Sequence, residues 1–294
     1  MRKNINSFLL TFAVAIALAV LAVTSAPAGD KPKAEEVVAK HLDAVGSSDA
    51  RAALKSLNVE GNFFEKFLRG GTGQSGGPFA MVSTGHKLVM QAKFNMPDFP
   101  GESYGFDGEK KSIGYIVPGQ RSQLEDFINY NGEVIQDGLL GGILTTAWPL
   151  YDWQDRKARI DVDGLKKVDG KELLRVTYHP RHGGGDLKIY LFFDPESFRH
   201  VKTIYTQQSQ GQMGTSVDRG TLSGAGGGAG GSLTLEEDFG GFAKINNLML
   251  PTQWSLKYAQ EGIGSGSSMI QVDTVIDKIQ ANPNVTGVVF RIGS

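Results

Sequence analysis

Histidines and paired carboxylates are the residues of this chain whose types and spacing could do chemistry. His179 and His182 lie three positions apart, with His200 further along, and imidazole nitrogens are common zinc ligands. The first two flank a glycine-rich turn at residues 183–185, which is poorly suited to hold rigid metal geometry. We therefore interpret the histidines as exposed turn residues and expect no metal site.

Acidic residues that lie close together could supply acid–base chemistry. Asp161 and Asp163 would share a strand face, but they lack the loop spacing of a calcium site. We interpret Glu236, Glu237 and Asp238 as a solvated strand end. A carboxylate pair that hydrolyses glycosides is defined by the distance between its members in space, which a sequence does not show. Nothing in the sequence marks such a pair, and a hydrolase stays open as an alternative.

The other catalytic and cofactor motifs are missing or lack the required context. The sequence has no G-x-S-x-G, H-E-x-x-H or Walker A pattern. Residues 71–76 match G-x-G-x-x-G, but a strand-like segment follows where phosphate binding needs a helix, so we predict a hairpin turn. Cysteine is absent, which excludes disulfides, thiolate chemistry and lipidation on cysteine. We therefore expect no cofactor and no enzyme activity.

The first 28 residues have the pattern of an export signal. Arg2 and Lys3 precede an apolar run at residues 8–23, and small residues follow, which predicts cleavage after Ala28. The run is near the lower length limit of a spanning helix, so an uncleaved anchor stays open, and no later segment could span. An exported chain without disulfides indicates a bacterial periplasm. The formal charge of −1, or −3 without Arg2 and Lys3, argues against nucleic acid.

The pattern of apolar residues predicts a mainly β fold in a single domain, residues 29–294. Residues 34–45 have helical spacing, and a period of two recurs from residue 57 onward. Among the expected strands are residues 111–117, 159–162, 165–168 and 285–292, with turns at residues 70–77 and at Asp163-Gly164. About 11–13 strands at meander spacing favour a curved antiparallel sheet or incomplete barrel.

Two segments interrupt the strands. Residues 122–153 are strongly apolar and contain glycines at 138, 141 and 142, which predicts two short helices and suits a hinged lid. Residues 211–231 are rich in glycine and cannot bury enough surface to offset their entropy, so we expect a flexible loop there.

Three stretches together resemble exported LolA/LolB-like proteins, the outer-membrane lipoprotein-sorting family. They are residues 34–59, beginning AEEVVAKHLDAVG; residues 191–201, LFFDPESFRHV; and residues 238–256 with 279–292. The resemblance covers nearly the whole predicted mature chain. It implies a half-barrel whose apolar concave face is covered by helices and takes acyl chains of a lipid or lipoprotein. The glycine tract and the chain length depart from the compact carriers of that family.

The bottom-up pattern is compatible with such a cavity. The residues that would line it are Leu88, Met90, Phe94, Ile113, Tyr115, Leu174, Val176, Leu187, Ile189, Leu191 and Phe193. The residues that would form the lid are Leu139, Leu140, Ile143, Leu144 and Trp148. The hypothesis is a periplasmic carrier that holds acyl chains without covalent chemistry. The alternative is a non-enzymatic sensor or scaffold of the cell envelope, with protein partners, in which the same residues simply pack on one another.

Overall fold

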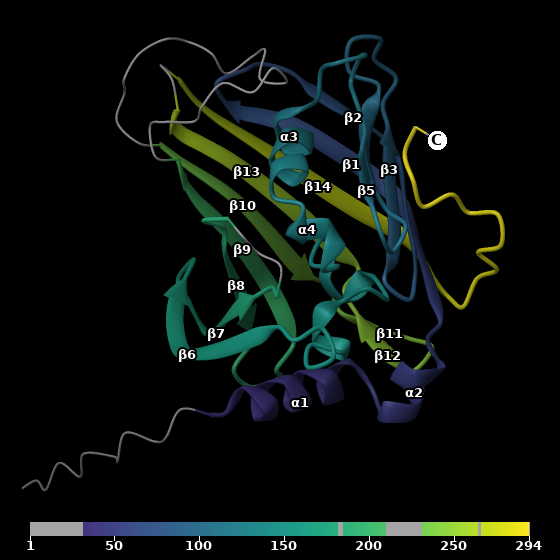
Figure 1. The fold of residues 1–294 in the computed structure, drawn as a ribbon, viewed down its shortest axis with the longest axis vertical. Helices are drawn as coiled ribbons and strands as arrows, with labels where there is room; N and C mark the ends of the chain where they lie inside the picture. The colour runs from purple at the N-terminus through teal and green to yellow at the C-terminus, as the bar shows by residue number, and fades with distance from the viewer. Residues whose placement is uncertain (1–31, 182–184, 210–230, 264–265, 294) are drawn as a thin grey trace, which may run out of the picture. The chain divides into compact units, whose positions relative to one another are not determined.

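Twelve of the strands form one strongly curved antiparallel sheet that is not closed into a barrel (Figure 1). The computed structural model describes residues 32–181, 185–209, 231–263 and 266–293. The predicted signal peptide and nearly all of the glycine-rich loop lie outside these residues. The prediction of a mainly β, curved antiparallel sheet with few helices is confirmed.

The sheet consists of two meanders joined side by side. Its strand order is β5-β4-β3-β2-β1-β14-β13-β10-β9-β8-β7-β6. The bounds are β1 Ser56–Arg69, β2 Gln74–Thr84, β3 Lys87–Lys93, β4 Gly101–Phe106, β5 Lys111–Ile113, β6 Arg159–Val168, β7 Lys171–His179, β8 Lys188–Phe193, β9 His200–Ser209, β10 Gly231–Gly240, β13 Gln253–Ile263 and β14 Gly266–Ala281. The antiparallel pairing of β1 with β14, for example Phe63 opposite Thr274, joins the two meanders.

One segment connects the two free edges of the sheet. It runs from the end of β5 to the start of β6, residues 114–158, and we call it the crossing segment. It contains α3 (Gln123–Tyr130), α4 (Glu133–Gln136) and two short 3-10 turns, Gly142–Leu144 and Pro149–Tyr151. Figure 1 shows α3 and α4 lying over β13 and β14, so the segment covers the concave face of the open sheet.

The remaining elements lie at one end of the sheet. Helix α1 (Ala34–Val45) contacts β12 (Leu248–Leu250), β6 and the Pro149–Tyr151 turn. Strand β12 pairs with β11 (Ala243–Ile245) in a separate two-stranded sheet, and α2 (Ser48–Ala53) follows α1 (Figure 1). The apolar stripe of α1 is buried there, as helical spacing predicts.

A single hydrophobic cluster fills the space between the concave face and the crossing segment. Its largest fully buried side chains are Trp148, Trp254, Tyr104, Tyr178 and Tyr205. Because burying each large apolar side chain contributes roughly 1.5–3 kcal/mol, this cluster is the main source of the fold's stability.

Three local predictions were wrong. The turn predicted at Asp163-Gly164 is a bulge inside the continuous strand β6, because the Asp163 carboxylate is held across the ladder by Arg175 at 2.8 Å and by Thr177. The glycine-rich turn is shorter than residues 70–77, since β2 already begins at Gln74. The strand Leu248–Leu250 is not among the strands predicted from the sequence.

Two predicted strands are shortened or absent. Strand β5 ends at Ile113, and the chain leaves the sheet at Gly114, where a Cβ would lie 2.1 Å from the Ser103 hydroxyl oxygen and 2.8 Å from Glu125 Oε1. Residues 285–292 form no strand. They are held by side-chain contacts instead: the Ile292 N–H donates to the Ser112 hydroxyl at 2.8 Å, and Arg291 pairs with Asp107.

Candidate functional site

The predicted cavity residues mostly pack on one another. All of Leu88, Met90, Phe94, Ile113, Leu174, Val176, Ile189, Leu191 and Phe193 are buried in the central cluster. The predicted lid residues Leu139, Leu140, Ile143, Leu144 and Trp148 are buried in the same cluster, directly over them. The two sets of residues therefore lie together, as a covered concave face requires. That any of them touches a ligand stays a prediction.

Two predicted lining residues are less buried, and one of them, Tyr115, lies away from the cluster. Tyr115 is 52% exposed, follows the end of β5 and carries the Arg121 guanidinium 4.0 Å above its ring. Leu187 is only partly buried and precedes β8. Tyr115 misses the concave face because the chain leaves the sheet at Gly114, which ends the two-residue alternation on which its placement depended.

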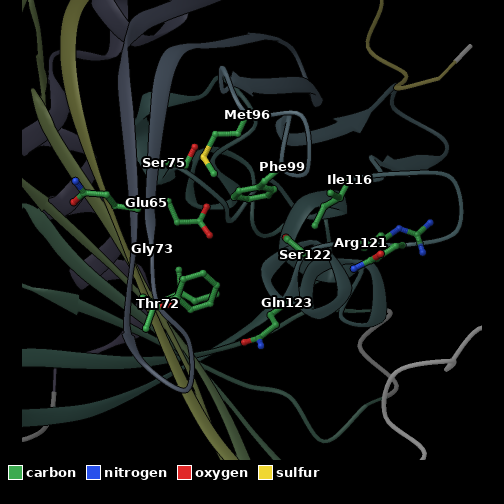
Figure 2. A pocket seen from close by; sticks show the side chains of 14 residues that line it. Glu65, Thr72, Gly73, Ser75, Met96, Phe99, Ile116, Arg121, Ser122 and Gln123 are labelled. Atoms are coloured by element: carbon green, nitrogen blue, oxygen red, sulfur yellow. The ribbon is translucent and has the colours of Figure 1, made fainter.

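A pocket of about 340 Å³ opens at the end of the concave face where α3 begins (Figure 2). We call it the rim pocket. Its apolar wall comes from β1, β14 and the loops beside α3, and comprises Phe67, Met96, Phe99, Ile116 and Ile270. Its polar wall includes Glu65, Ser75, Arg121, Ser122 and Gln123. The volume lies at the lower end of the ~300–1,000 Å³ range typical of ligand pockets.

Glu65 brings a carboxylate into this pocket. It is 4% exposed and points inward from β1 in Figure 2. Its cross-strand neighbours are Ser75 on β2 and Val272 on β14. Burial, with the nearby charge of Glu125, raises the pKa of Glu65 to about 7. Neither Glu65 Oε2 nor the Ser75 hydroxyl has a hydrogen-bond partner among the described residues.

Two further buried carboxylates belong to the same cluster. Glu102 on β4 is 1% exposed, and the Tyr104 hydroxyl donates to its Oε2 while Oε1 has no partner. Glu125 closes the capping box of α3, accepting from the N–H groups of Ser103 and Ser122, each at 3.2 Å. Burial raises the pKa of Glu125 to about 7, and burial together with the charges of Glu65 and Glu125 raises that of Glu102.

The groups on the wall of the rim pocket do not form the pairs that hydrolases use. Glu65 is the single carboxylate on the wall of the rim pocket, where hydrolysis of a glycoside needs two. Ser75 lies opposite Glu65 in the ladder, but its hydroxyl donates to no base, so it is not activated as a nucleophile. The Ser122 hydroxyl accepts from the Glu125 N–H as the cap of α3.

The histidines considered as metal ligands are not brought together, and the interpretation of His200 as an exposed turn residue was wrong. His179 lies on the outer part of β7, where its Nε2 is 2.8 Å from Asp161, and His200 is fully buried in the core. His182 lies outside the described residues. Among the residues that the structure describes, no group of histidine and acidic side chains could hold a metal ion.

Buried polar contacts anchor the crossing segment to the sheet. The Glu237 carboxylate on β10 is 0% exposed and accepts from the Gly141 N–H at 2.8 Å, the Tyr205 hydroxyl at 2.7 Å and the Trp254 indole at 2.9 Å. Burial raises the pKa of Glu237 to about 7. The interpretation of this residue as part of a solvated strand end was wrong, because its position in the ladder turns it inward.

A second anchor joins the segment to α1. The Trp148 indole donates to His41 Nε2 at 3.1 Å, and the other ring nitrogen of His41 therefore donates to the Phe198 carbonyl at 3.0 Å. Complete burial lowers the pKa of His41 to about 4, so the imidazole is neutral at pH 7. His200 stacks on Trp148 with 4.6 Å between ring centroids.

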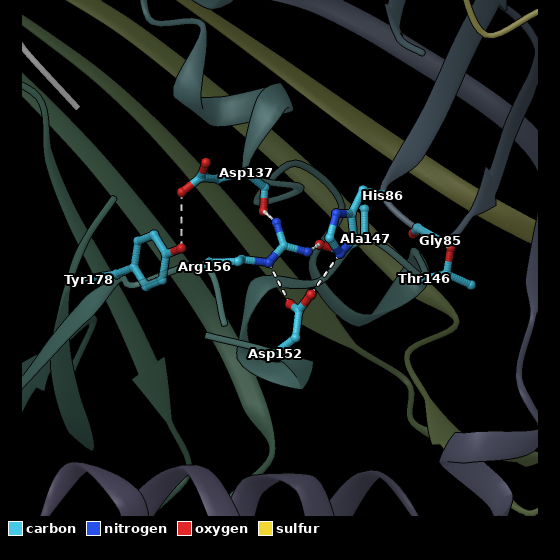
Figure 3. Close-up of polar contacts among 8 residues, drawn as sticks. All are labelled: Gly85, His86, Asp137, Thr146, Ala147, Asp152, Arg156 and Tyr178. Atoms are coloured by element: carbon cyan, nitrogen blue, oxygen red, sulfur yellow. Dashed lines mark hydrogen bonds and ion pairs between the residues drawn. The ribbon is translucent and has the colours of Figure 1, made fainter. Parts of the chain in front are cut away.

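A third anchor is the Arg156 guanidinium, shown in Figure 3. It donates to the carbonyls of Asp137 and Ala147, both at 3.0 Å, and to the Asp152 carboxylate at 2.5 Å. Asp152 in turn lies 2.6 Å from His86 Nε2 in the β2–β3 turn. The guanidinium thus holds both ends of the loop that carries the predicted lid residues.

The glycines of this loop are required by local geometry. Gly138 has φ +69°, and a Cβ there would lie 2.1 Å from the Ala147 carbonyl oxygen. Gly141 and Gly142 also have positive φ, and a Cβ on Gly142 would meet Phe239 and His200. Glycine is needed at these positions for a left-handed backbone in tight packing.

No protein-family model and no curated protein matches the sequence. Similar solved structures include a DUF1329 family protein from Desulfovibrio piger, 12% identical with a TM-score of 0.46, over 85% of this chain and 93% of that one. A LolA superfamily protein from Nitrosomonas europaea is 14% identical with a TM-score of 0.42, over 86% and 94% of the two chains. A candidate outer membrane lipoprotein-sorting protein domain from Vibrio parahaemolyticus is 9% identical with a TM-score of 0.43, over 86% and 94%.

The similar structures found thus include DUF1329 and LolA superfamily proteins. At these identities the likeness concerns the fold alone. No helix among the described residues is long and apolar enough to cross a bilayer.

Sequence reasoning missed the carboxylate cluster of the rim pocket. Glu65, Glu102 and Glu125 are spread over sixty positions and form no motif. One signal was present: Glu65 falls in the inward phase of its strand, between Phe63 and Phe67. A charged residue in the inward phase of a strand is a candidate functional residue, since burying it is costly unless it has a partner.

Proposed function

We propose that this protein is an exported carrier that binds a single apolar chain, such as an acyl chain, without covalent chemistry. The observation that carries the proposal is the rim pocket, with its wall of Phe67, Met96, Phe99, Ile116 and Ile270 at the open end of an apolar concave face. Transfer of a chain from water into such a site is worth roughly 0.8 kcal/mol per CH₂. The export pattern of residues 1–28 supports a location in the periplasm, where such cargo must be shielded from water.

Binding is tested with an alkyl probe that carries a fluorophore and an uncharged head group. Ile116→Trp fills the pocket from a loop, so we expect it to weaken probe binding at least tenfold. Val117→Trp is the matched control, because Val117 is its neighbour, is 41% exposed and does not line the pocket. Equal binding by the two variants would place the probe elsewhere, and absence of binding to the unsubstituted protein would refute the carrier function.

Whether cargo also enters beneath the crossing segment can be tested with a reversible lock. The chain contains no cysteine, and the Thr146 N–H donates to the Ser83 hydroxyl at 2.9 Å, which brings the two residues close enough to attempt a disulfide. In Ser83→Cys/Thr146→Cys, cargo that enters beneath the segment is taken up only after reduction. Equal uptake by the oxidised and reduced forms would confine the cargo to the rim pocket.

The second candidate is a non-enzymatic envelope scaffold with a self-filled core. The observation in its favour is the close packing of the predicted lid residues on the predicted lining residues. Native mass spectrometry of protein from a detergent-free periplasmic extract separates the two. A lipid or acylated peptide bound at near one per chain supports the carrier, and a co-purifying protein without lipid supports the scaffold.

A further inference from the structure

The rim pocket combines an apolar wall with buried acceptors that lack donors. Glu65 is nine-tenths buried and points into the cavity, and its Oε2 has no partner among the described residues (Figure 2). The Ser75 hydroxyl beside it is also without a partner. An unsatisfied buried charge is costly to fold, so an acceptor left open in a cavity wall points to a donor supplied from outside.

No cationic side chain among the described residues forms an ion pair with this cluster. No ion pair formed by the described residues includes Glu65, Glu102 or Glu125. Lys66, the next residue on β1, faces the other side of the sheet and pairs with Asp273 at 3.5 Å. Glu65 therefore reaches the pocket wall without a paired cation among the described residues.

The single cationic residue of the pocket wall is used elsewhere. Arg121 donates to the Gly114 carbonyl at 3.1 Å, lies over the Tyr115 ring and points away from the cavity in Figure 2. It lowers the pKa of Glu125 through its charge, but it forms no ion pair with Glu65. Gln123 is also engaged, since its carbonyl oxygen accepts from the Ser268 hydroxyl at 2.7 Å.

We propose that the rim pocket selects an amphiphile whose apolar chain ends in a primary ammonium group, with the ammonium seated against Glu65. The inference rests on the carrier function and names the class of its ligand. An ammonium offers three donors and a positive charge, which match the open carboxylate oxygen and the Ser75 hydroxyl. A carboxylate head group is repelled by the cluster, and a hydroxyl head group offers one donor and no charge.

The proposal is tested by the affinities of dodecylamine, dodecanol and dodecanoate, measured by calorimetry at pH 7.5 below their micelle concentrations. A hydrogen bond to a charged group gives an expected preference for dodecylamine over dodecanol of about ten- to hundredfold. Glu65→Gln keeps the shape of the side chain and removes its charge, so the preference should fall to less than about threefold by the same reasoning. Glu60→Gln, a half-exposed site on the same strand, should keep the preference.

A second measurement guards against a general effect of the substitution. Seating an ammonium beside the carboxylates lowers their pKa values, so dodecylamine binding should release protons at pH 7. The release is measured by repeating the titration in buffers of different ionisation enthalpy. Dodecanol should release fewer protons, and Glu65→Gln should reduce the release that dodecylamine causes.

The outcomes separate the two proposals. If dodecanol or dodecanoate binds as tightly as dodecylamine, the ammonium preference is wrong and the carrier function stands. The same holds if Glu65→Gln folds and keeps the preference. If none of the three probes binds, the carrier function itself fails.

Discussion

The buried carboxylate of Glu237 makes the strongest quantitative prediction about stability. It has no cation beside it, and burial raises its pKa from the ordinary value of 4.5 to about 7. The folded state therefore holds a proton on this group where the unfolded state has lost it. Stability from this group is complete below pH 4.5 and falls as the pH rises to about 7. At ~1.4 kcal/mol per pH unit, the loss amounts to about 3 kcal/mol.

Glu237→Gln removes the charge and keeps an acceptor oxygen for Gly141 and Trp254. The hydrogen bond with Tyr205 must reverse or break, which shifts the stability by about 1 kcal/mol at every pH. The difference in unfolding free energy between variant and unsubstituted protein should rise by about 3 kcal/mol from pH 4 to pH 8. Urea denaturation followed by tryptophan fluorescence measures both proteins across this range.

Two further variants control this experiment. Glu237→Leu removes the acceptor for three buried donors, each worth roughly 1–3 kcal/mol, so it should be destabilised at every pH. Glu172→Gln changes an exposed carboxyl on β7 and should follow the unsubstituted protein. Parallel stability curves for Glu237→Gln and the unsubstituted protein would refute the reasoning, because they would show that the buried carboxyl titrates alike in both states.

Three further predictions concern the anchors of the crossing segment. The lysine of Arg156→Lys cannot span two carbonyls and a carboxylate. We expect the free energy of urea unfolding to fall by about 2 kcal/mol and amide exchange to be faster in residues 137–156 than in β1 and β14. Uniform exchange would count against the anchor. Gly138→Ala should lower the free energy of unfolding by more than about 2 kcal/mol. Gly170→Ala, with φ +80° and open space around it, should lower it by ~1–2 kcal/mol. Equal losses would contradict the close approach of Gly138 to Ala147. The pKa of His41 is lowered to about 4, so its contribution to the free energy of unfolding is complete above pH 6.5, and about 3 kcal/mol of it is lost as the pH falls to 4. His41→Gln should remove this dependence on pH from acid unfolding curves. An unchanged dependence would assign it to other groups.

Much of the fold was predictable because strand alternation is a local property. The alternation along β3 and β7 placed Leu88, Met90 and Val176 on an inward face, and all three are buried. Prediction failed where a long-range contact altered the local pattern. The sequence predicts a turn at Asp163, but its contacts with Arg175 and Thr177 hold the strand together through a bulge.

The candidate site was less predictable than the fold. The sequence marked the apolar crossing segment, and the structure places it over the concave face as expected. The polar groups of the rim pocket were not predicted, since Glu65 and Ser75 have no chemical motif in common. They meet only because β1 and β2 pair in a register that sets these two residues opposite each other.

The sequence by itself determined a mainly β chain with one apolar helical interruption, because the periods of strands and helices are written in neighbouring residues. It also contained the export pattern of residues 1–28. The tertiary structure decided that β1 joins β14, that the interruption bridges the two free edges, and that Glu65, Glu102 and Glu125 gather at one rim. These features depend on contacts between residues far apart in the chain. The free energy of each contact arises only when its groups are brought together and removed from water.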